Sequence, residues 1–171
     1  MGAIVRQPFL NPLHSSQEVT RRMETADLMV IGSGQGGTPL ASDYATAERK
    51  VVIFERDVLG GSCINYGCTP SKAFLAAAHA AGRARQAEKL GIQAEISVDF
   101  LTVMQRVRGI RDSFHQGVKT RLESAGVTIV GAEASFTALR TLRGGDREVQ
   151  ARSWSSTQAR LRSFLIFPRF T

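Results

Sequence analysis

Two short segments of the sequence hold the residue types on which redox and phosphate chemistry depend. Cys63 and Cys68 lie five residues apart in the run GGSCINYGCTPSK, and the glycine-rich run GSGQGG begins at Gly32. Two cysteines can alternate between a pair of thiols and a disulfide. Glycine-rich turns let backbone N–H groups approach a phosphate closely. Together the two segments predict a redox site beside a nucleotide site.

The glycine run has the spacing G-x-G-x-x-G in the context that such a motif needs. It follows an apolar strand predicted over 26–31, opens a helix predicted over 37–48, and precedes a second strand over 51–54. Gly32 would form the tight turn, Gly34 would let a pyrophosphate approach, and Gly37 would allow close helix–strand packing. Glu55, at the end of the second strand, would accept hydrogen bonds from a ribose diol and would repel a 2′-phosphate. A glycine-rich turn without a ligand is the alternative.

The spacing of the cysteines restricts their chemistry. Five residues of regular helix would separate them by about 7.5 Å along the axis, so a bridge needs a distorted turn, which Gly67 permits. Cys68 would stand at the N-terminus of the helix that Pro70 opens, where a thiolate is stabilised. A redox-active disulfide is favoured over two buried free thiols, a static bridge or a metal site. No metal site is predicted, because the three histidines are scattered: His14, His79 and His115.

Length and composition predict one domain, or one and a fraction, with a buried core. The chain has 171 residues, of which 43% are hydrophobic, and a net charge of +7. Residues 151–171 contain four arginines and no acid, so most of the excess charge belongs to the tail rather than to a nucleic-acid surface. No apolar run approaches the roughly 20 residues of a membrane span, and no signal peptide is recognised. We therefore expect a cytoplasmic protein without nucleic-acid or membrane partners.

The remaining patterns complete an α/β domain. They predict a helix over 69–90, a long amphipathic helix over 98–124, a strand over 127–130 and a small antiparallel meander over 133–149. The expected fold is a Rossmann-like, three-layer domain with a parallel sheet, helices and the meander. The expected division is an N-terminal extension (1–25), an FAD-binding domain that is incomplete (26–150) and a basic tail (151–171).

The motifs together resemble those of the class I pyridine nucleotide-disulfide oxidoreductases. These flavoprotein disulfide reductases include dihydrolipoamide dehydrogenase, glutathione reductase and mercuric reductase, and the resemblance covers their N-terminal FAD-binding portion. It implies FAD as the cofactor, bound by Gly32, Ser33, Gly34, Gly36, Gly37, Glu55, Arg56, Gly61, Ser62, Lys72 and Ala134.

The resemblance also implies a role for each residue near the flavin. Cys68 corresponds to the flavin-facing thiol, and Cys63 to the thiol that attacks the substrate. Ser62 matches a small hydroxyl residue near the cofactor, and Lys72 matches a lysine near the flavin N5 edge. Ala134 lies in a stretch that matches the segment whose backbone contacts the adenine. Electrons would pass from NAD(P)H to FAD, then to the cysteine pair, and then to a small-molecule disulfide, thiol or metal-ion substrate.

Several features of that family are missing from this sequence. There is no second glycine motif for NAD(P)H, no T-G segment returning to the FAD, and no C-terminal dimerisation domain with its His-Glu pair, although family members are homodimers. None of the three histidines matches that histidine. The chain is thus expected to be an N-terminal fragment of such an enzyme; the alternatives are a catalytically incompetent flavin-binding remnant and an interaction module that uses the basic tail.

The sequence changes character after Gln150, where an apolar strand should follow. A translational frameshift is our hypothesis for this change, with a genuine lineage-specific tail as the alternative. Loss of that strand would expose an apolar edge of the sheet and predicts low solubility and poor FAD retention.

Overall fold

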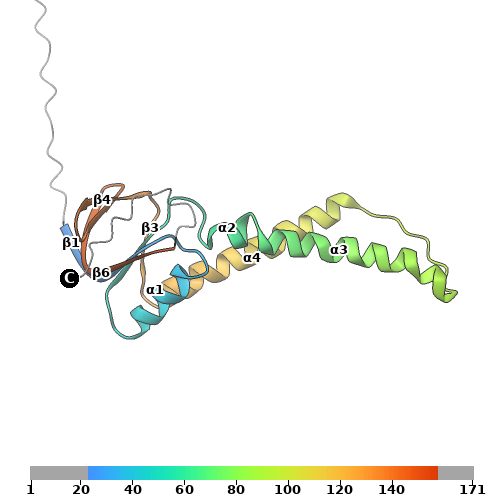
Figure 1. Ribbon diagram of the computed structural model, residues 1–171, viewed down its shortest axis with the longest axis horizontal. Helices are drawn as coiled ribbons and strands as arrows, with labels where there is room; N and C mark the ends of the chain where they lie inside the picture. The colour runs from blue at the N-terminus through green and yellow to red at the C-terminus, as the bar shows by residue number, and fades with distance from the viewer. Residues whose placement is uncertain (1–22, 158–171) are drawn as a thin grey trace, which may run out of the picture.

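The computed structural model describes residues 23–157, which form one mixed sheet and a pair of long helices (Figure 1). The elements are β1 (Met23–Ile31), α1 (Gly37–Thr46), β2 (Val51–Phe54), α2 (Gly61–Asn65), α3 (Cys68–Gln86), the 3-10 helix η1 (Ala87–Leu90), α4 (Phe100–Ser124), β3 (Thr128–Val130), β4 (Ala134–Ala138), β5 (Thr141–Gly144) and β6 (Arg147–Ser156). The predicted α/β class and the order of strands, helices and meander are confirmed.

The sheet has six strands in the order β3-β2-β1-β6-β5-β4. Strand β1 lies between β2 and β6 and is parallel to both, and β3 continues the parallel part beyond β2. Strands β4, β5 and β6 form the antiparallel meander. The carboxyl ends of four parallel strands therefore meet at one edge, which is where ligands bind to sheets of this kind.

The core has two apolar clusters, one on each face of the parallel strands. Met29 of β1 packs on one face with Leu142 of β5, so the meander covers this side. Leu28 packs on the other face with Ala41 of α1 and Leu122 of α4. Leu122 and Leu142 are fully enclosed, and burying a leucine side chain contributes about 1.5–3 kcal/mol. Meander, parallel sheet and helices are thus the three layers expected from the sequence.

Helices α3 and α4 run side by side and form an arm that extends away from the sheet (Figure 1). Helix α4 begins at Asp99, whose carboxylate accepts hydrogen bonds from the backbone N–H groups of Leu101 and Thr102. The hydrogen bond from the Thr102 hydroxyl and those from the two N–H groups lower the pKa of Asp99. An edge-to-face contact between Phe74 and Phe100 joins the two helices.

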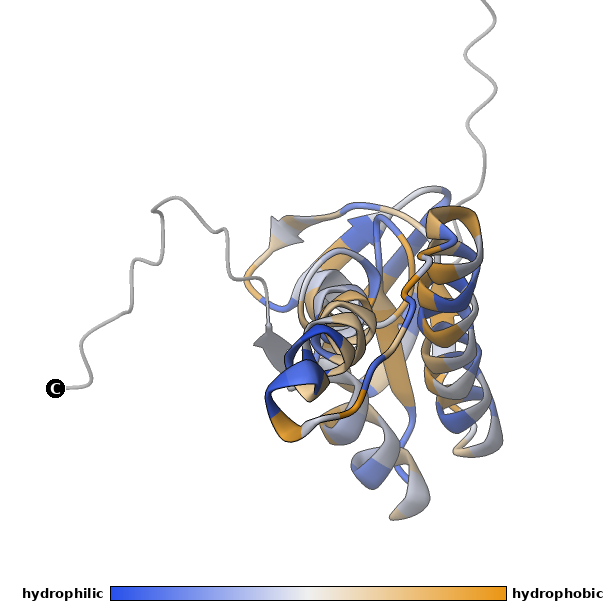
Figure 2. Cartoon of the chain, turned by 90° about the vertical axis from the view of Figure 1, so that its right-hand side faces the viewer, coloured by the Kyte–Doolittle hydropathy of each residue, from blue (hydrophilic) through white to orange (hydrophobic). Residues whose placement is uncertain are grey.

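The apolar face predicted for α4 is only partly covered. Val107 and Leu122 are buried, but Phe100 is 61% and Phe114 is 56% exposed. Figure 2 looks at the molecule from the end of the arm and shows hydrophobic stretches in orange among hydrophilic ones. Within residues 23–157, no helix is both long enough and apolar enough to cross a membrane.

Strand β6 contradicts the predicted loss of a strand after residue 150. Ala151 pairs with Ala26 and Ser156 with Ile31, so the chain does rejoin the parallel sheet. The prediction was wrong because serines and arginine stand where a buried parallel strand usually has aliphatic residues. The side chain of Trp154 is 38% exposed, whereas Val149 and Ala151 of β6 are buried, and the strand pairs with β1 along its length. The apolar sheet edge, and the low solubility and poor FAD retention predicted from it, lose their basis.

The N-terminal limit of the domain also differs from the prediction. Strand β1 begins at Met23, inside the extension expected over 1–25. The rest of that extension and residues 158–171 of the predicted basic tail lie outside the described residues.

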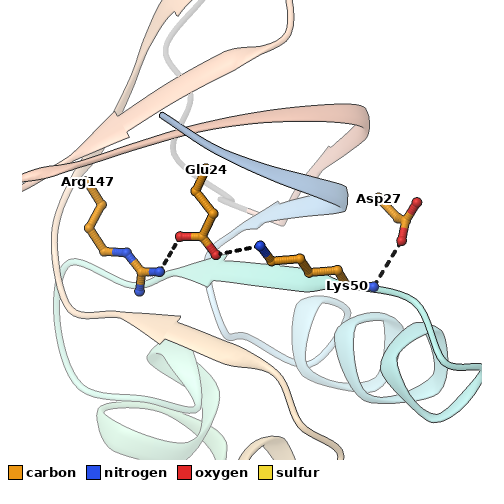
Figure 3. Close-up of polar contacts among 4 residues, drawn as sticks. All are labelled: Glu24, Asp27, Lys50 and Arg147. Carbon is orange, nitrogen blue, oxygen red and sulfur yellow. Dashed lines mark hydrogen bonds and ion pairs between the residues drawn. The ribbon is translucent and has the colours of Figure 1, made fainter. Parts of the chain in front are cut away.

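A group of ionic contacts joins the amino ends of three strands (Figure 3). The carboxylate of Glu24 pairs with the Lys50 ammonium at 3.1 Å and with the Arg147 guanidinium. Asp27 accepts a hydrogen bond from the backbone N–H of Lys50 at 3.0 Å. Burial raises the pKa of Glu24, but the hydrogen bonds and charges of Lys50 and Arg147 outweigh it and hold that pKa below its usual value.

Candidate redox and nucleotide site

The glycine turn at the carboxyl end of β1 has a shape that only glycine permits. Gly32 has a φ of 90°, which other residues rarely adopt. A Cβ atom at Gly37 would lie 2.1 Å from the Gly32 carbonyl oxygen. Helix α1 can therefore start directly against the end of β1, with its N-terminus at the turn. This geometry matches the tight turn and close packing predicted for Gly32 and Gly37.

Ser33 connects the glycine turn to Glu55 and to the loop before α2. Its backbone N–H and its hydroxyl donate to the same Glu55 carboxylate oxygen, at 2.9 and 2.7 Å. The hydroxyl accepts a hydrogen bond from the backbone N–H of Gly60 at 2.9 Å. Ser33 is fully buried. Its side chain and its backbone N–H thus position Glu55 and Gly60.

Helix α2, which holds Cys63, begins in contact with the glycine turn. Gly60 and Gly61 both have positive φ angles, of 101° and 67°. A Cβ atom at Gly61 would lie 2.8 Å from the Gly34 Cα. The backbones of the two motifs therefore touch, and a side chain at Gly61 would push the cysteine helix away from the turn.

Two further side chains hold the loop that leads into α2. The buried Asn65 amide donates to the carbonyl oxygens of Val58, Leu59 and Gly61, at 3.2, 2.9 and 3.0 Å. His115 of α4 places its Nδ1 3.0 Å from the same Leu59 carbonyl oxygen. These contacts connect the cysteine helix to the long helix of the arm. Sequence reasoning assigned no role to either residue.

The two cysteines lie on either side of a break between helices. Helix α2 ends at Asn65, and Cys68 is the first residue of α3. This start lies one residue before the helix start predicted at Thr69 and Pro70. Both cysteines are thiols, Cys63 half-buried and Cys68 exposed. A hydrogen bond to the Cys68 thiol raises the pKa of Cys63, burial acts in the same direction, and the charge of Lys72 acts against them. The pair is thus close enough for one thiol to affect the other.

A hollow of about 810 Å³ brings the two motifs together. Its lining includes Ser33, Gly34, Cys63, Cys68 and Lys72, and one wall is formed by α4. Five residues predicted from separate motifs therefore share one space.

The other predicted cofactor residues lie outside this hollow. Arg56 follows Glu55 and pairs with Glu133 at 3.1 Å, next to Ala134 at the start of β4. Gly36 and Ser62 are at the surface. The predicted residues thus form two groups, one around the cysteines and one around the end of β2, with the glycine turn between them.

Thr157, which sequence reasoning did not identify, returns the chain to the glycine turn. Its backbone N–H donates to the Ile31 carbonyl at 3.0 Å, and its hydroxyl donates to the Gly32 carbonyl at 2.9 Å. The next residue in the sequence is glutamine rather than the glycine of the expected T-G segment. A threonine seven residues after the predicted end of the domain was the available signal, and it was obscured by the serine-rich strand before it.

Comparison with known proteins extends over nearly the whole described region. Residues 26–154 match the family described as pyridine nucleotide-disulphide oxidoreductase. The chain belongs to this family. The resemblance predicted from the glycine and cysteine motifs is confirmed, and the match continues past residue 150 into β6.

The relatives of this pyridine nucleotide-disulphide oxidoreductase chain include several dihydrolipoyl dehydrogenases. Dihydrolipoyl dehydrogenase 2 of Haloarcula marismortui is 37% identical over 123 residues, which are 70% of this chain and 26% of the relative. The dihydrolipoyl dehydrogenase of Geobacillus stearothermophilus is 37% identical over 118 residues, 68% of this chain and 25% of the relative. The dihydrolipoyl dehydrogenase of Staphylococcus aureus is 39% identical over 123 residues, which are 71% of this chain and 26% of the relative. The chain spans about a quarter of the length of these curated relatives.

Proposed function

We propose that this chain is the FAD-binding portion of an oxidoreductase in which Cys63 and Cys68 exchange electrons with a small-molecule disulfide or dithiol. The contact between Gly61 and Gly34 supports this proposal most directly, because it joins the cysteine helix to the nucleotide turn. The effect of the Cys68 thiol on the pKa of Cys63 adds to this support. The names of the relatives favour a dithiol such as a dihydrolipoyl group as the substrate class.

The residues present fit a dinucleotide with a flavin at one end. Gly37 has no room for a side chain and Gly32 has a positive φ, as a tight cradle for a pyrophosphate requires. Glu55 is held by Ser33 at the end of β2, where it would accept the hydroxyls of a ribose. Arg56 and Ala134 would lie beside the adenine end, and Ser62 and Lys72 beside the flavin end. Bound FAD would supply two-electron transfer between a nicotinamide and the cysteine pair.

The cysteines themselves would perform the thiol–disulfide exchange. In the dithiol state, the Cys63 thiolate attacks one sulfur of a disulfide substrate, a mixed disulfide forms, and the other substrate sulfur leaves and takes up a proton. The Cys68 thiolate then attacks the Cys63 sulfur, which releases the second substrate thiol and forms the Cys63–Cys68 disulfide. Two electrons pass to the substrate, and the reverse sequence oxidises a dithiol.

Flavin titration and thiol counting test this proposal. FAD added to the full chain should give the absorption spectrum of a protein-bound flavin. An Ellman count should find two reactive thiols after reduction and none after equilibration with oxidised glutathione and removal of the excess. Cys63→Ser and Cys68→Ser should retain FAD but should not form the internal disulfide. A folded chain that never binds FAD, or that keeps two thiols in the oxidising buffer, would refute the proposal.

Anaerobic addition of NADH separates a complete electron path from a flavin-binding remnant. Bleaching of the bound flavin would show that this chain also accepts a hydride donor. Unchanged flavin absorbance, with FAD bound and the disulfide formed, would mean that the nicotinamide site requires residues beyond this chain.

A further inference from the structure

A second hollow lies away from the cysteine pair, toward the amino ends of β1 and β2. Its volume is about 470 Å³. Residues from β1, from the position before β2, from the β4–β5 turn and from β6 line it, including Asp27, Lys50, Arg140, Gln150 and Arg152. The proposed function uses none of these residues.

The lining has an excess of positive charge. Lys50 pairs with Glu24 at 3.1 Å, and Asp27 accepts a hydrogen bond from the Lys50 backbone N–H (Figure 3). Arg140 and Arg152 form no ion pair within residues 23–157, whereas Arg147 at the start of β6, the strand that contains Arg152, pairs with Glu24. Two guanidinium groups without an ion pair therefore line one hollow, whose single carboxylate, that of Asp27, is bonded to the Lys50 backbone N–H. Like charges in proximity repel one another, and an anion between them would remove that repulsion.

The backbone places these two arginines at neighbouring positions of the sheet. The carbonyl of Arg140 accepts a hydrogen bond from the N–H of Ala151 at 3.0 Å, which places Arg140 across from the residue that precedes Arg152. Ala151 is buried and pairs with Ala26 of β1, so this arrangement belongs to the folded sheet. Arginine is well suited to phosphoryl groups because its planar guanidinium donates two parallel hydrogen bonds.

We propose that this hollow binds a small molecule with a phosphoryl group, which Arg140 and Arg152 would hold by charge-assisted hydrogen bonds. Lys50 would add positive charge, and the Gln150 amide could donate a neutral hydrogen bond. The hollow is larger than one phosphate ion and falls within the usual size of small-molecule sites. It is separate from the glycine turn, which follows the other end of β1.

Chemical-shift mapping tests this site on the full chain labelled with ¹⁵N. The probes are inorganic phosphate and glycerol 3-phosphate, with glycerol as the uncharged control, all at constant ionic strength. We expect both phosphates to shift the amide signals of Ala26, Asp27 and Ala151. The double variant R140Q/R152Q should weaken this binding at least about tenfold, because two charge-assisted hydrogen bonds are lost. R140K/R152K should recover part of the affinity.

A second double variant controls for net charge. R85Q/R108Q removes the same two charges from exposed positions on the arm and should leave the phosphate affinity within about twofold of the original. Equal weakening by both double variants would overturn the proposal, because general electrostatics would then explain the binding. Shifts confined to residues 32–37, or no saturable shifts at all, would overturn it as well. FAD binding should be unchanged in R140Q/R152Q, so the result is independent of the proposed function.

Discussion

Replacing Ser33 with alanine should destabilise the chain although it removes only one oxygen atom. The hydroxyl donates to the Glu55 carboxylate at 2.7 Å and accepts from the Gly60 N–H at 2.9 Å, and both Ser33 and Gly60 are buried. Loss of a hydrogen bond to a charged group and an unsatisfied buried N–H should together lower the free energy of unfolding by about 2–4 kcal/mol. The Ser33 backbone N–H would still hold Glu55.

Ser42 provides a matched control for this variant. It is buried in α1, and its hydroxyl has no hydrogen-bond partner in the described part of the chain. Ser42→Ala removes the same atom but breaks no contact, so it should change the free energy of unfolding by about 1 kcal/mol or less, or raise it. Urea unfolding can be followed by circular dichroism and by the fluorescence of Trp154, the only tryptophan, whose ring packs on Phe136. Equal unfolding midpoints for the two variants would show that the Ser33 contacts do not stabilise the fold.

Three other predictions concern single contacts. Cys68→Ala removes the thiol that raises the pKa of Cys63. Cys63 should therefore be alkylated faster at pH 7.5, and the profile of its alkylation rate against pH should move to lower pH. An unchanged profile would contradict the thiol–thiol contact. Because the pKa of Glu24 is lowered in the folded chain, its ion pairs stabilise the fold above the usual carboxyl range and lose that effect as the pH falls through the lowered pKa. The urea midpoint should therefore decline less between pH 6 and pH 3 in Glu24→Gln than in the original chain. Parallel declines in the two chains would count against these ion pairs. Gly37→Ala should unfold the turn or weaken FAD binding at least about tenfold, because its Cβ would lie 2.1 Å from a backbone oxygen. The control Gly82→Ala in α3 has open space around it and should stabilise the helix by about 0.5–1 kcal/mol. A folded, FAD-binding Gly37→Ala chain would contradict the close packing.

The glycine turn and the position of Glu55 could be predicted because local spacing determines them. A short apolar strand, a tight turn and a helix within 30 residues allow few arrangements, and the acid after the second strand must then stand beside the turn. The start of α3 was predictable for the same reason, since Gly67 and Pro70 mark the break and the new start, whereas the short helix α2 was not predicted. The roles of individual cofactor residues remain predictions.

The contacts that fix these motifs in space could not be predicted from spacing. Asn65 and His115 bind backbone carbonyls, and such hydrogen bonds leave no periodic pattern in a sequence. The part of β6 after residue 150 was missed because most of its side chains are polar, while its pairing depends on the open edge of β1. The opposite case is α4, whose apolar period was recognised in the sequence. The exposure of Phe114 could not be predicted, because how much of the apolar face of α4 is covered depends on the geometry of the arm.

The position of β1 between β2 and β6 also has a consequence for the time course of folding. Strand β2 follows β1 closely in the chain, but β6 lies far downstream. The Thr157 hydroxyl, directly after β6, donates a hydrogen bond to the Gly32 carbonyl across 125 residues. At a ribosomal rate of about 5–20 residues per second, the central strand would wait roughly 6–25 s for its second partner. Such long-range closure slows folding. During synthesis, one edge of β1 therefore stays unpaired until β6 has been made.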